Sequence, residues 1–137
     1  MVRVTRAGEY AIRGMIRLAR DGGDSLALIA DIAAAEGVSK SFLAKQFQRL
    51  VKAGLVESSR GAAGGVALAR PAEQISLRDI IEAVEGPVEL NRCLSASDRC
   101  KNADTCPLSD VWREAQTRML DVLGGVTLAK ITNRPNA

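Results

Sequence analysis

The chain has 137 residues, of which 47% are hydrophobic, and this predicts one small globular core that a partner subunit can extend. No continuous apolar stretch resembles a signal peptide or a membrane span, so we expect a soluble, cytoplasmic protein without membrane contact. The net charge of +3 is unevenly distributed: residues 1–70 contain 11 Lys and Arg against 6 Asp and Glu, whereas residues 71–137 contain 8 against 10. A basic N-terminal half is typical of a region that faces nucleic acid, although it also occurs on ordinary solvated surfaces.

Three short helices are predicted in the first part of the chain. Residues 5–20 carry apolar side chains at helical spacing and end at an Asp-Gly-Gly turn. Residues 26–37 predict a second helix that ends at a glycine. A third helix starts after Ser39 or Ser41, either of which can serve as its N-cap, and ends near residue 53.

The third helix has one apolar and one basic face. The apolar side chains that predict a core-facing stripe are Leu43, Phe47, Leu50 and Val51. The basic side chains, spaced i, i+4 and i+7 on another face, are Lys45, Arg49 and Lys52. Two short helices joined by a glycine-containing turn, the second one basic, predict a helix-turn-helix that places this third helix in the major groove. The alternative is a small helical bundle with solvated lysines.

Residues 55–71 favour the first interpretation. Apolar segments at 55–56 and 66–68 flank a glycine-rich turn, a pattern that predicts a β-hairpin. A hairpin directly after a recognition helix is a wing, and Arg60 at its turn is expected to enter the minor groove. The residues expected to approach DNA are Ser39, Lys40, Ser41, Lys45 and Arg49 on the helix and Arg60 on the wing.

Two further helices are predicted beyond the hairpin. Ser76 to Asp79 has the form of a capping box and starts a helix that reaches about Val84. Residues 109–123 predict a long amphipathic helix with the apolar positions Val111, Ala115, Met119, Val122 and Leu123. Such a helix after a compact unit favours a homodimer, and a two-fold dimer suits a palindromic double-stranded operator.

The predicted fold class is therefore mainly α with a small β-hairpin wing: a winged helix-turn-helix followed by a long C-terminal dimerisation helix. We assign residues 1–87 to the DNA-binding domain, 88–108 to a cysteine-rich loop, and 109–137 to the dimerisation helix and C-terminal tail. Enzymatic activity is not expected, because the chain has no histidine for general-base catalysis, no phosphate-binding glycine loop after a strand and no nucleophile-base pair.

All three cysteines of the chain, Cys93, Cys100 and Cys106, lie within fourteen residues. In a reducing compartment such a group is more often metal-binding or redox-active than disulfide-bonded, and an odd number cannot pair completely within one chain. Their spacing allows three thiolates to surround an iron-sulphur cluster. A zinc site would normally use four Cys or His ligands in closer pairs, whereas nearby basic residues also favour a thiol redox sensor. On the residues alone, all three interpretations stay open.

Several stretches resemble the Rrf-two family of bacterial winged-helix regulators, which has IscR-like, NsrR-like and RirA-like members. These are FLAKQFQRLVKAGLVESSRGAAGGVALAR, SLRDIIEAVEGP, the three cysteines, and LSDVWREAQTRML, which together cover nearly the whole chain. The resemblance implies a transcriptional repressor whose cysteines bind a 2Fe-2S or 4Fe-4S cluster. Cluster state would alter DNA affinity in response to redox state, nitric oxide, or iron and cluster supply. The alternative is a cluster-free member controlled by cysteine oxidation or by a partner protein.

The resemblance leaves the fourth cluster ligand to be assigned. IscR-like members use a histidine shortly after the third cysteine, but this chain has Ser109 there and contains no histidine. NsrR-like members use an acidic residue near the start of the first helix of the partner subunit, and Glu9 occupies the matching position. The resemblance thus implies that Glu9 ligates across the dimer. The ordinary interpretation of Glu9 is a first-turn carboxylate that interacts well with the helix dipole. Rival ligands are Ser109, Asp98, Asp104, Asp110 and a small exogenous molecule.

Overall fold

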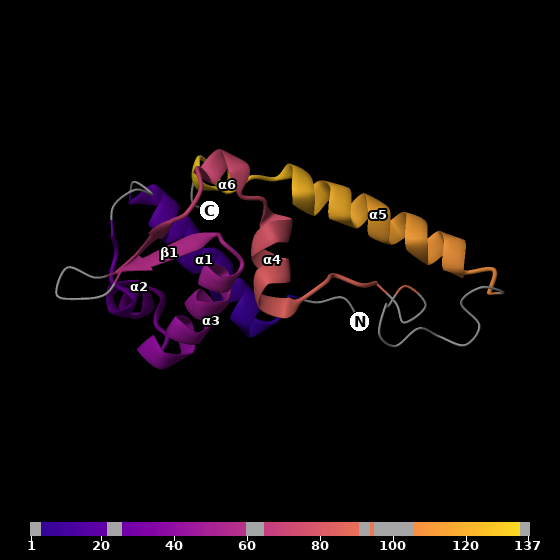
Figure 1. Ribbon diagram of the computed structural model, residues 1–137. Coiled ribbons are helices and arrows are strands. Elements are labelled where there is room, and N and C mark those ends of the chain that lie inside the picture. Colours follow the sequence, from indigo (N-terminus) through magenta and orange to yellow (C-terminus); the bar gives the residue numbers. More distant parts are fainter. Residues whose placement is uncertain (1–3, 22–25, 60–64, 91–93, 95–105, 135–137) are drawn as a thin grey trace.

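A central helix, α1 (Arg6–Arg20), organises the fold of the computed structural model, which describes residues 4–21, 26–59, 65–90, 94 and 106–134. Helices α2, α3, α4 and α6 and strand β2 all pack against α1 (Figure 1). The remaining elements are α2 (Ile29–Glu36), α3 (Lys40–Lys52), β1 (Val56–Ser59), β2 (Gly65–Leu68), the 3-10 helix η1 (Ala72–Gln74), α4 (Leu77–Glu85), α5 (Ser109–Gly125) and α6 (Leu128–Thr132). This is the expected mainly helical architecture with a small antiparallel hairpin.

Local sequence signals determine where most helices begin and end. The Ser39 hydroxyl caps α3 by accepting from the Phe42 backbone N–H at 3.1 Å, and Gly37, with a φ of 73°, ends α2. The predicted capping box of α4 is confirmed. The Asp79 N–H donates to the Ser76 hydroxyl, and the Ser76 N–H donates to the Asp79 carboxylate, each at 3.0 Å.

The second helix begins later than its sequence pattern predicts. Residues 26–28 are not helical, and Ala27 pairs instead with Val66 of the wing in an antiparallel bridge. The two backbone hydrogen bonds between Ala27 and Val66 are each 2.8 Å long. A Cβ atom on the neighbouring Gly65 would lie 2.6 Å from the Ala27 carbonyl oxygen, so the close approach of the two backbones requires glycine there. Tertiary pairing thus takes these residues out of the helix.

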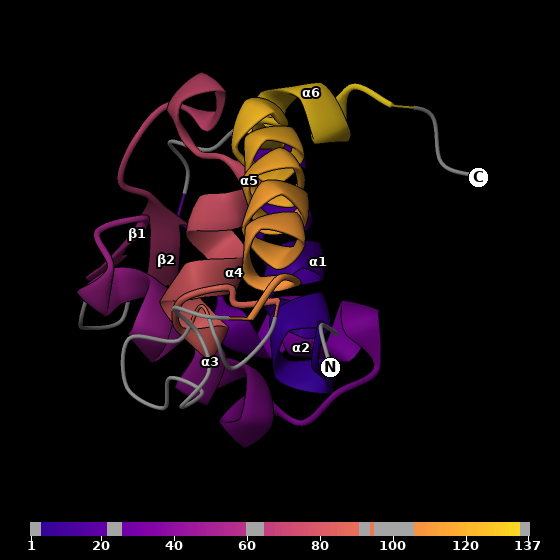
Figure 2. The same cartoon turned by 90° about the vertical axis from the view of Figure 1, so that its right-hand side faces the viewer.

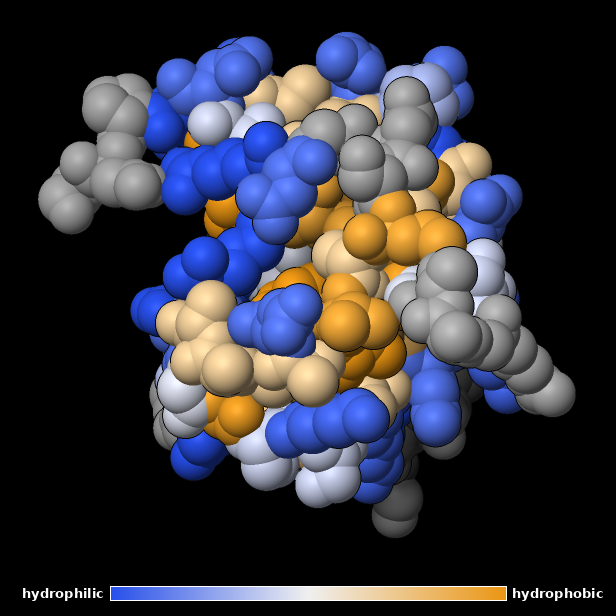
Figure 3. All heavy atoms as spheres, turned by 90° about the vertical axis from the view of Figure 1, so that its left-hand side faces the viewer, coloured by the Kyte–Doolittle hydropathy of each residue, from blue (hydrophilic) through white to orange (hydrophobic). Residues whose placement is uncertain are grey.

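The wing is confirmed as a two-stranded antiparallel sheet. β1 and β2 pair from Val56 with Leu68 to Ser59 with Gly65. Val56 and Val66 are buried on the core side, whereas residues 57–59 are exposed. The predicted turn at the tip of the hairpin, including Arg60, lies outside the described residues. On the face that carries the hairpin and α2, hydrophilic residues surround a central apolar patch (Figure 3).

The segment after α5 forms a helix that the sequence pattern does not predict. We expected only a tail there, but Leu128 of α6 is fully buried in the core. Two backbone bonds hold this segment to the start of α4: the Leu77 N–H donates to the Val126 carbonyl at 2.9 Å, and the Leu128 N–H donates to the Ile75 carbonyl at 2.7 Å. Residues 126–132 therefore belong structurally to the winged-helix body.

Helix α5 passes α4 and extends away from the body (Figures 1 and 2). The apolar positions predicted on it separate into two groups. Met119 and Leu123 are half-buried and line a cavity of about 260 Å³ together with residues of α4, whereas Val111 and Val122 remain 54% and 65% exposed. Among the described residues, no helix is both long enough and apolar enough to span a membrane.

The recognition-helix candidate α3 is packed against α1 through Phe47, which is 1% exposed. The ring lies over Gly14 of α1, where an added Cβ atom would be 2.8 Å from the nearest ring carbon. Burying a side chain of this size contributes roughly 1.5–3 kcal/mol to stability. The absence of a side chain at Gly14 is therefore what allows α3 to approach α1 this closely.

We expect Gly14→Ala to lower the free energy of unfolding by about 1–3 kcal/mol, because a buried ring cannot move aside without repacking. The measurement is urea denaturation followed by circular dichroism. Gly125→Ala is the matched control: its Cβ would meet nothing within 4 Å, so the helix preference of alanine should leave stability unchanged or raise it by up to about 1 kcal/mol. Equal stability of Gly14→Ala and wild type would show that Phe47 is not confined by α1.

Candidate nucleic-acid interface and cysteine segment

The first two turns of α3 present an exposed polar and basic surface. Leu43, Phe47 and Leu50 are buried, which turns the opposite side of the helix to solvent. The residues of this helix and its N-cap that are predicted to approach DNA are all exposed: Ser39, Lys40, Ser41, Lys45 and Arg49. Hydroxyl groups and ammonium groups at the start of a helix are suited to contact base edges and phosphates. Arg60, the predicted wing contact, lies outside the described residues.

Two residues of α3 differ from the predicted apolar stripe. Val51 is 36% exposed, whereas Gln46 is only 3% exposed. The Gln46 side-chain amide donates to the Phe42 carbonyl at 3.3 Å, so its burial does not leave the amide without a partner. Residue type alone marks glutamine as a surface residue, and the signal that identifies it here is its place between Leu43 and Leu50 at helical spacing.

Arg49 is exposed, and its guanidinium also makes contacts within the protein. Its Nη1 atom donates to the Val84 carbonyl at the end of α4, at 3.1 Å, and to the Gln46 side-chain oxygen, at 3.4 Å. The Val84 carbonyl belongs to the last turn of α4, where carbonyl groups lack helical partners and attract cations. The predicted role of Arg49 in DNA contact is thus accompanied by a specific structural contact.

A further basic residue, Arg6, stands beside the N-terminus of α3. Its guanidinium carbon lies 5.5 Å from the ring centroids of both Tyr10 and Phe42, and these two rings meet edge to face at 6.0 Å. Cation–π contacts of this kind hold a guanidinium in place without neutralising its charge. Residue spacing gives no signal for a role of Arg6, and only the excess of basic residues in the first half of the chain indicates a basic surface there.

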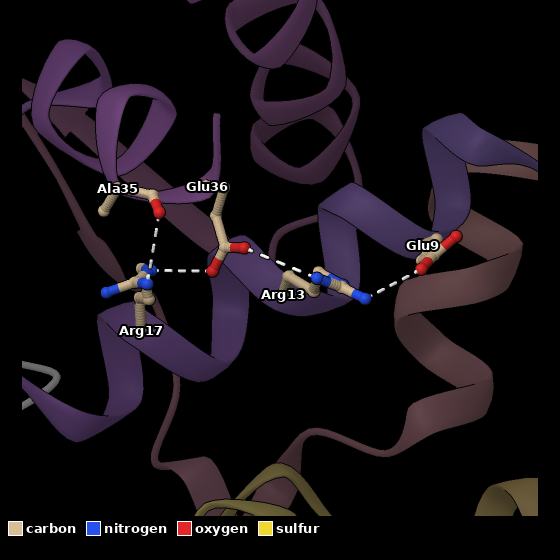
Figure 4. Close-up of polar contacts among 5 residues, drawn as sticks. All are labelled: Glu9, Arg13, Arg17, Ala35 and Glu36. Carbon is tan, nitrogen blue, oxygen red and sulfur yellow. Dashed lines mark hydrogen bonds and ion pairs between the residues drawn. The ribbon is translucent and has the colours of Figure 1, made fainter. Parts of the chain in front are cut away.

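Glu9, the predicted cluster ligand, lies at one end of a chain of ion pairs between α1 and α2 (Figure 4). Its carboxylate is 3.0 Å from Arg13 Nη2, and Arg13 Nη1 is 3.8 Å from the Glu36 carboxylate. Glu36 also accepts from Arg17 Nε at 2.6 Å. The side chains of Glu9 and Arg13 are about half exposed, whereas that of Glu36 is only 12% exposed.

The two ends of this network differ in strength. An exposed ion pair such as Glu9–Arg13 is worth roughly 0–1 kcal/mol, because water competes for both charges. Glu36 is shielded between two arginines at the last residue of α2. Glu9 is therefore a solvent-facing carboxylate that can leave Arg13 at little cost.

The structure describes one of the three cysteines. Cys106 is a free, half-buried thiol just before α5, and its carbonyl accepts from the Ser109 N–H at 3.1 Å. Cys93 and Cys100 lie outside the described residues. Within the described ranges, no three His, Cys, Asp or Glu side chains gather as a metal site. The other side of the cysteine segment is held by Leu90, whose N–H donates to the Gln116 side-chain oxygen of α5 at 2.7 Å.

Comparison with known proteins identifies the family of this chain. Residues 4–134 match the Rrf2 family, described as an iron-dependent transcriptional regulator. The HTH-type transcriptional regulator IscR of Yersinia enterocolitica is 36% identical over 132 residues, which cover 96% of this chain and 80% of that protein. IscR of Klebsiella pneumoniae is 34% identical with the same coverage of both chains. These relatives are transcription regulators and not enzymes.

Solved structures of similar fold include both IscR and CymR proteins. CymR, the global cysteine regulator of B. subtilis, superposes with a TM-score of 0.81 at 28% identity, covering 99% of this chain and 100% of that one. IscR of T. potens superposes with a TM-score of 0.73 at 29% identity, covering 99% and 94%. The family match over nearly the whole chain agrees with the exposed helix-turn-helix, the wing and the projecting α5. The chain therefore belongs to the Rrf2 family of winged-helix transcription regulators.

Proposed function

We propose that this regulator is a cytoplasmic repressor whose operator affinity is controlled by an iron-sulphur cluster bound to Cys93, Cys100 and Cys106. The observation that carries the proposal is the confinement of every cysteine to the one segment that joins α4 to α5. The family description as iron-dependent supports it. A 2Fe-2S or 4Fe-4S cluster in this segment would respond to redox state, nitric oxide, or iron and cluster supply.

The donor set fits such a cluster. Three thiolates are the soft ligands that iron-sulphur clusters prefer, and they leave one position for a different donor. We propose that Glu9 of the opposite subunit fills that position, since its carboxylate faces solvent and its pairing with Arg13 is weak. A carboxylate oxygen is a harder donor than a thiolate and is the most easily displaced of the four ligands. A bound cluster would supply an iron centre that reacts with small molecules at this corner.

DNA recognition is assigned to α3 and the wing. Ser39, Lys40, Ser41 and Lys45 are exposed together, in the position from which a recognition helix enters the major groove. Arg60 at the hairpin turn would enter the adjacent minor groove. A two-fold dimer would repeat both contacts on a palindromic double-stranded operator.

We assign dimerisation to α5. Val111, Ala115 and Val122 are exposed along one side of this helix, beside the half-buried Met119 and Leu123 that face α4. Leaving a contiguous apolar stripe in water is unfavourable, and a second copy of the same helix would cover it. A homodimer would also bring Glu9 of one chain toward the cysteine segment of the other.

A second candidate function is control by cysteine oxidation or by a partner protein without a cluster. The observation that favours it is the close structural likeness to CymR, which includes an oxidized form of Staphylococcus aureus CymR with a TM-score of 0.75 at 29% identity. The free thiol of Cys106 is compatible with either chemistry. Iron content and colour distinguish the two functions.

For DNA binding, we expect Lys45→Ala to weaken binding to operator DNA and to unrelated DNA by similar factors. Because the substitution removes a phosphate contact, it should also reduce the slope of log affinity against log salt concentration by about one.

Arg60→Ala should weaken operator binding while leaving the circular dichroism spectrum unchanged. Lys130→Ala, which removes the same charge from α6, is the control and should bind as wild type does. Unchanged operator affinity of Arg60→Ala at physiological salt would reject the wing contact.

For the cluster, anaerobically purified wild type should be brown and contain iron. Cys106→Ala should lose most of the iron and visible absorption, because a thiolate ligand is removed. Glu9→Ala should alter the spectrum or hasten cluster loss while helical content stays intact. Glu114→Ala breaks a similar exposed ion pair, with Arg118 at 3.0 Å, and should behave as wild type. A colourless wild-type protein with little iron would favour the cluster-free alternative.

For assembly, we expect a dimer at micromolar concentration by light scattering. Val122→Glu should shift it toward monomer, because a carboxylate replaces an apolar side chain that is 65% exposed in the single chain. Thr117→Glu, on the polar side of α5, should remain dimeric. A wild-type protein that is monomeric with its cluster present would contradict the assignment of α5.

A further inference from the structure

The C-terminal end of α4 connects three parts of the molecule. Val84 accepts a hydrogen bond from Arg49 of α3, and the next residue, Glu85, accepts one from the Thr5 backbone N–H at the start of α1, at 2.5 Å. Gly86, with a φ of 82°, then turns the chain out of the helix toward Leu90. The cysteine segment begins directly beyond this point.

The contact with α1 is close. A Cβ atom on Gly8 would lie 2.7 Å from a Glu85 carboxylate oxygen, so Glu85 rests on the first turn of α1 where that turn has no side chain. The carboxylate also stands at a helix N-terminus, where negative charge is favoured. The end of α4 and the turn of α1 that carries Glu9 are therefore held as one unit.

The contact with α3 is equally specific. Gln46 is nearly fully buried, bonds the Phe42 carbonyl through its nitrogen at 3.3 Å, and accepts from Arg49 through its oxygen at 3.4 Å. It thereby orients the guanidinium toward the Val84 carbonyl. Through this hydrogen bond, a side chain of α3 contacts the end of α4 one turn beyond Lys45.

We propose that Arg49 is a positioning residue that transmits the state of the cysteine segment to the recognition helix through the Val84 carbonyl. The inference rests on the proposed function, since it presupposes two states of that segment. A change in the segment displaces the end of α4 and thereby strengthens or weakens the Arg49–Val84 hydrogen bond, which sets the orientation of α3. Arg49 acts here through the orientation of α3 and not through a contact with DNA.

The test compares operator affinity of cluster-loaded and cluster-free protein in wild type and in Arg49→Met, which keeps the aliphatic stem and removes the guanidinium. Coupled sites typically change affinity by roughly 5- to 150-fold, and Arg49→Met should reduce the wild-type ratio to about 2 or less. Lys45→Ala is the matched control on the same helix. It should lower the affinity of both forms by the same factor and leave the ratio unchanged.

The possible outcomes separate the two proposals. If Arg49→Met lowers both affinities equally and preserves the ratio, Arg49 contacts DNA and the coupling is wrong. If cluster-loaded and cluster-free wild-type protein bind the operator equally, the proposed control by the cluster is wrong. The proposed coupling through Arg49 is then wrong as well. A ratio reduced to about 2 or less in Arg49→Met, with an intact circular dichroism spectrum, supports both proposals.

A measurement on the wild type keeps the test independent of how the variant folds. In protein labelled with ¹⁵N-arginine, with the Arg49 signal assigned from Arg49→Lys, solvent exchange of the guanidinium hydrogens should differ between the loaded and cluster-free forms. The coupling requires this difference because the Val84 hydrogen bond is the moving contact. Equal exchange in forms that differ in operator affinity would overturn it.

Discussion

The packing of the Phe47 ring against Gly14 is the constraint on which the arrangement of the DNA-binding surface depends. Because α1 has no side chain at Gly14, α3 lies against it with Leu43, Phe47 and Leu50 inside. A helix whose buried face is set in this way has its exposed face set as well. Ser39, Lys40, Ser41 and Lys45 are therefore presented together by core packing.

Around this core, the structure consists of a compact domain and one projecting helix, α5, whose apolar side chains are partly exposed. Residues that lie far apart in the chain close the body: Ala27 extends the wing through Val66, and Leu128 of α6 enters the core beside Ile75. Helix α5 contacts the body mainly through α4 and leaves Val111 and Val122 exposed. The same chain thus contains a domain that buries its apolar residues alone and a helix suited to bury them against a second copy.

Glu85 joins the end of α4, which leads to the cysteine segment, to the first turn of α1, which carries Glu9. Glu85 rests on Gly8, next to Glu9, while the chain leaves α4 toward the cysteines within a few residues. The Glu9 carboxylate is paired with Arg13, whereas the deeper Glu36 holds α1 to the end of α2 through Arg17. The shielded ion pair joins α1 to α2, and the exposed pair leaves a carboxylate that can change partners at little cost.

The sequence by itself determined most of the helices, the caps of α3 and α4, and the hairpin, because these depend on neighbours within a few residues. Ser39, Ser76 and Asp79 cap as their spacing predicts, and the order of elements identifies the winged helix. The grouping of three cysteines is also a property of the sequence, although Cys93, Cys100 and Arg60 lie outside the described structure. Charge and spacing placed Arg49 on the exposed face, where the structure has it, but they carry no information about its hydrogen bond to the Val84 carbonyl.

Only the tertiary structure decided the roles of residues whose partners are distant in the chain. Residues 26–28 leave their helical pattern to pair with the wing, the short α6 is stabilised by the core into which Leu128 inserts, and Gln46 is buried despite its polarity. The Arg49–Val84 and Glu85–Thr5 hydrogen bonds join residues 35 and 80 positions apart. Such contacts depend on how the helices pack in three dimensions, and local periodicity cannot specify them because it records only which face of each helix is apolar.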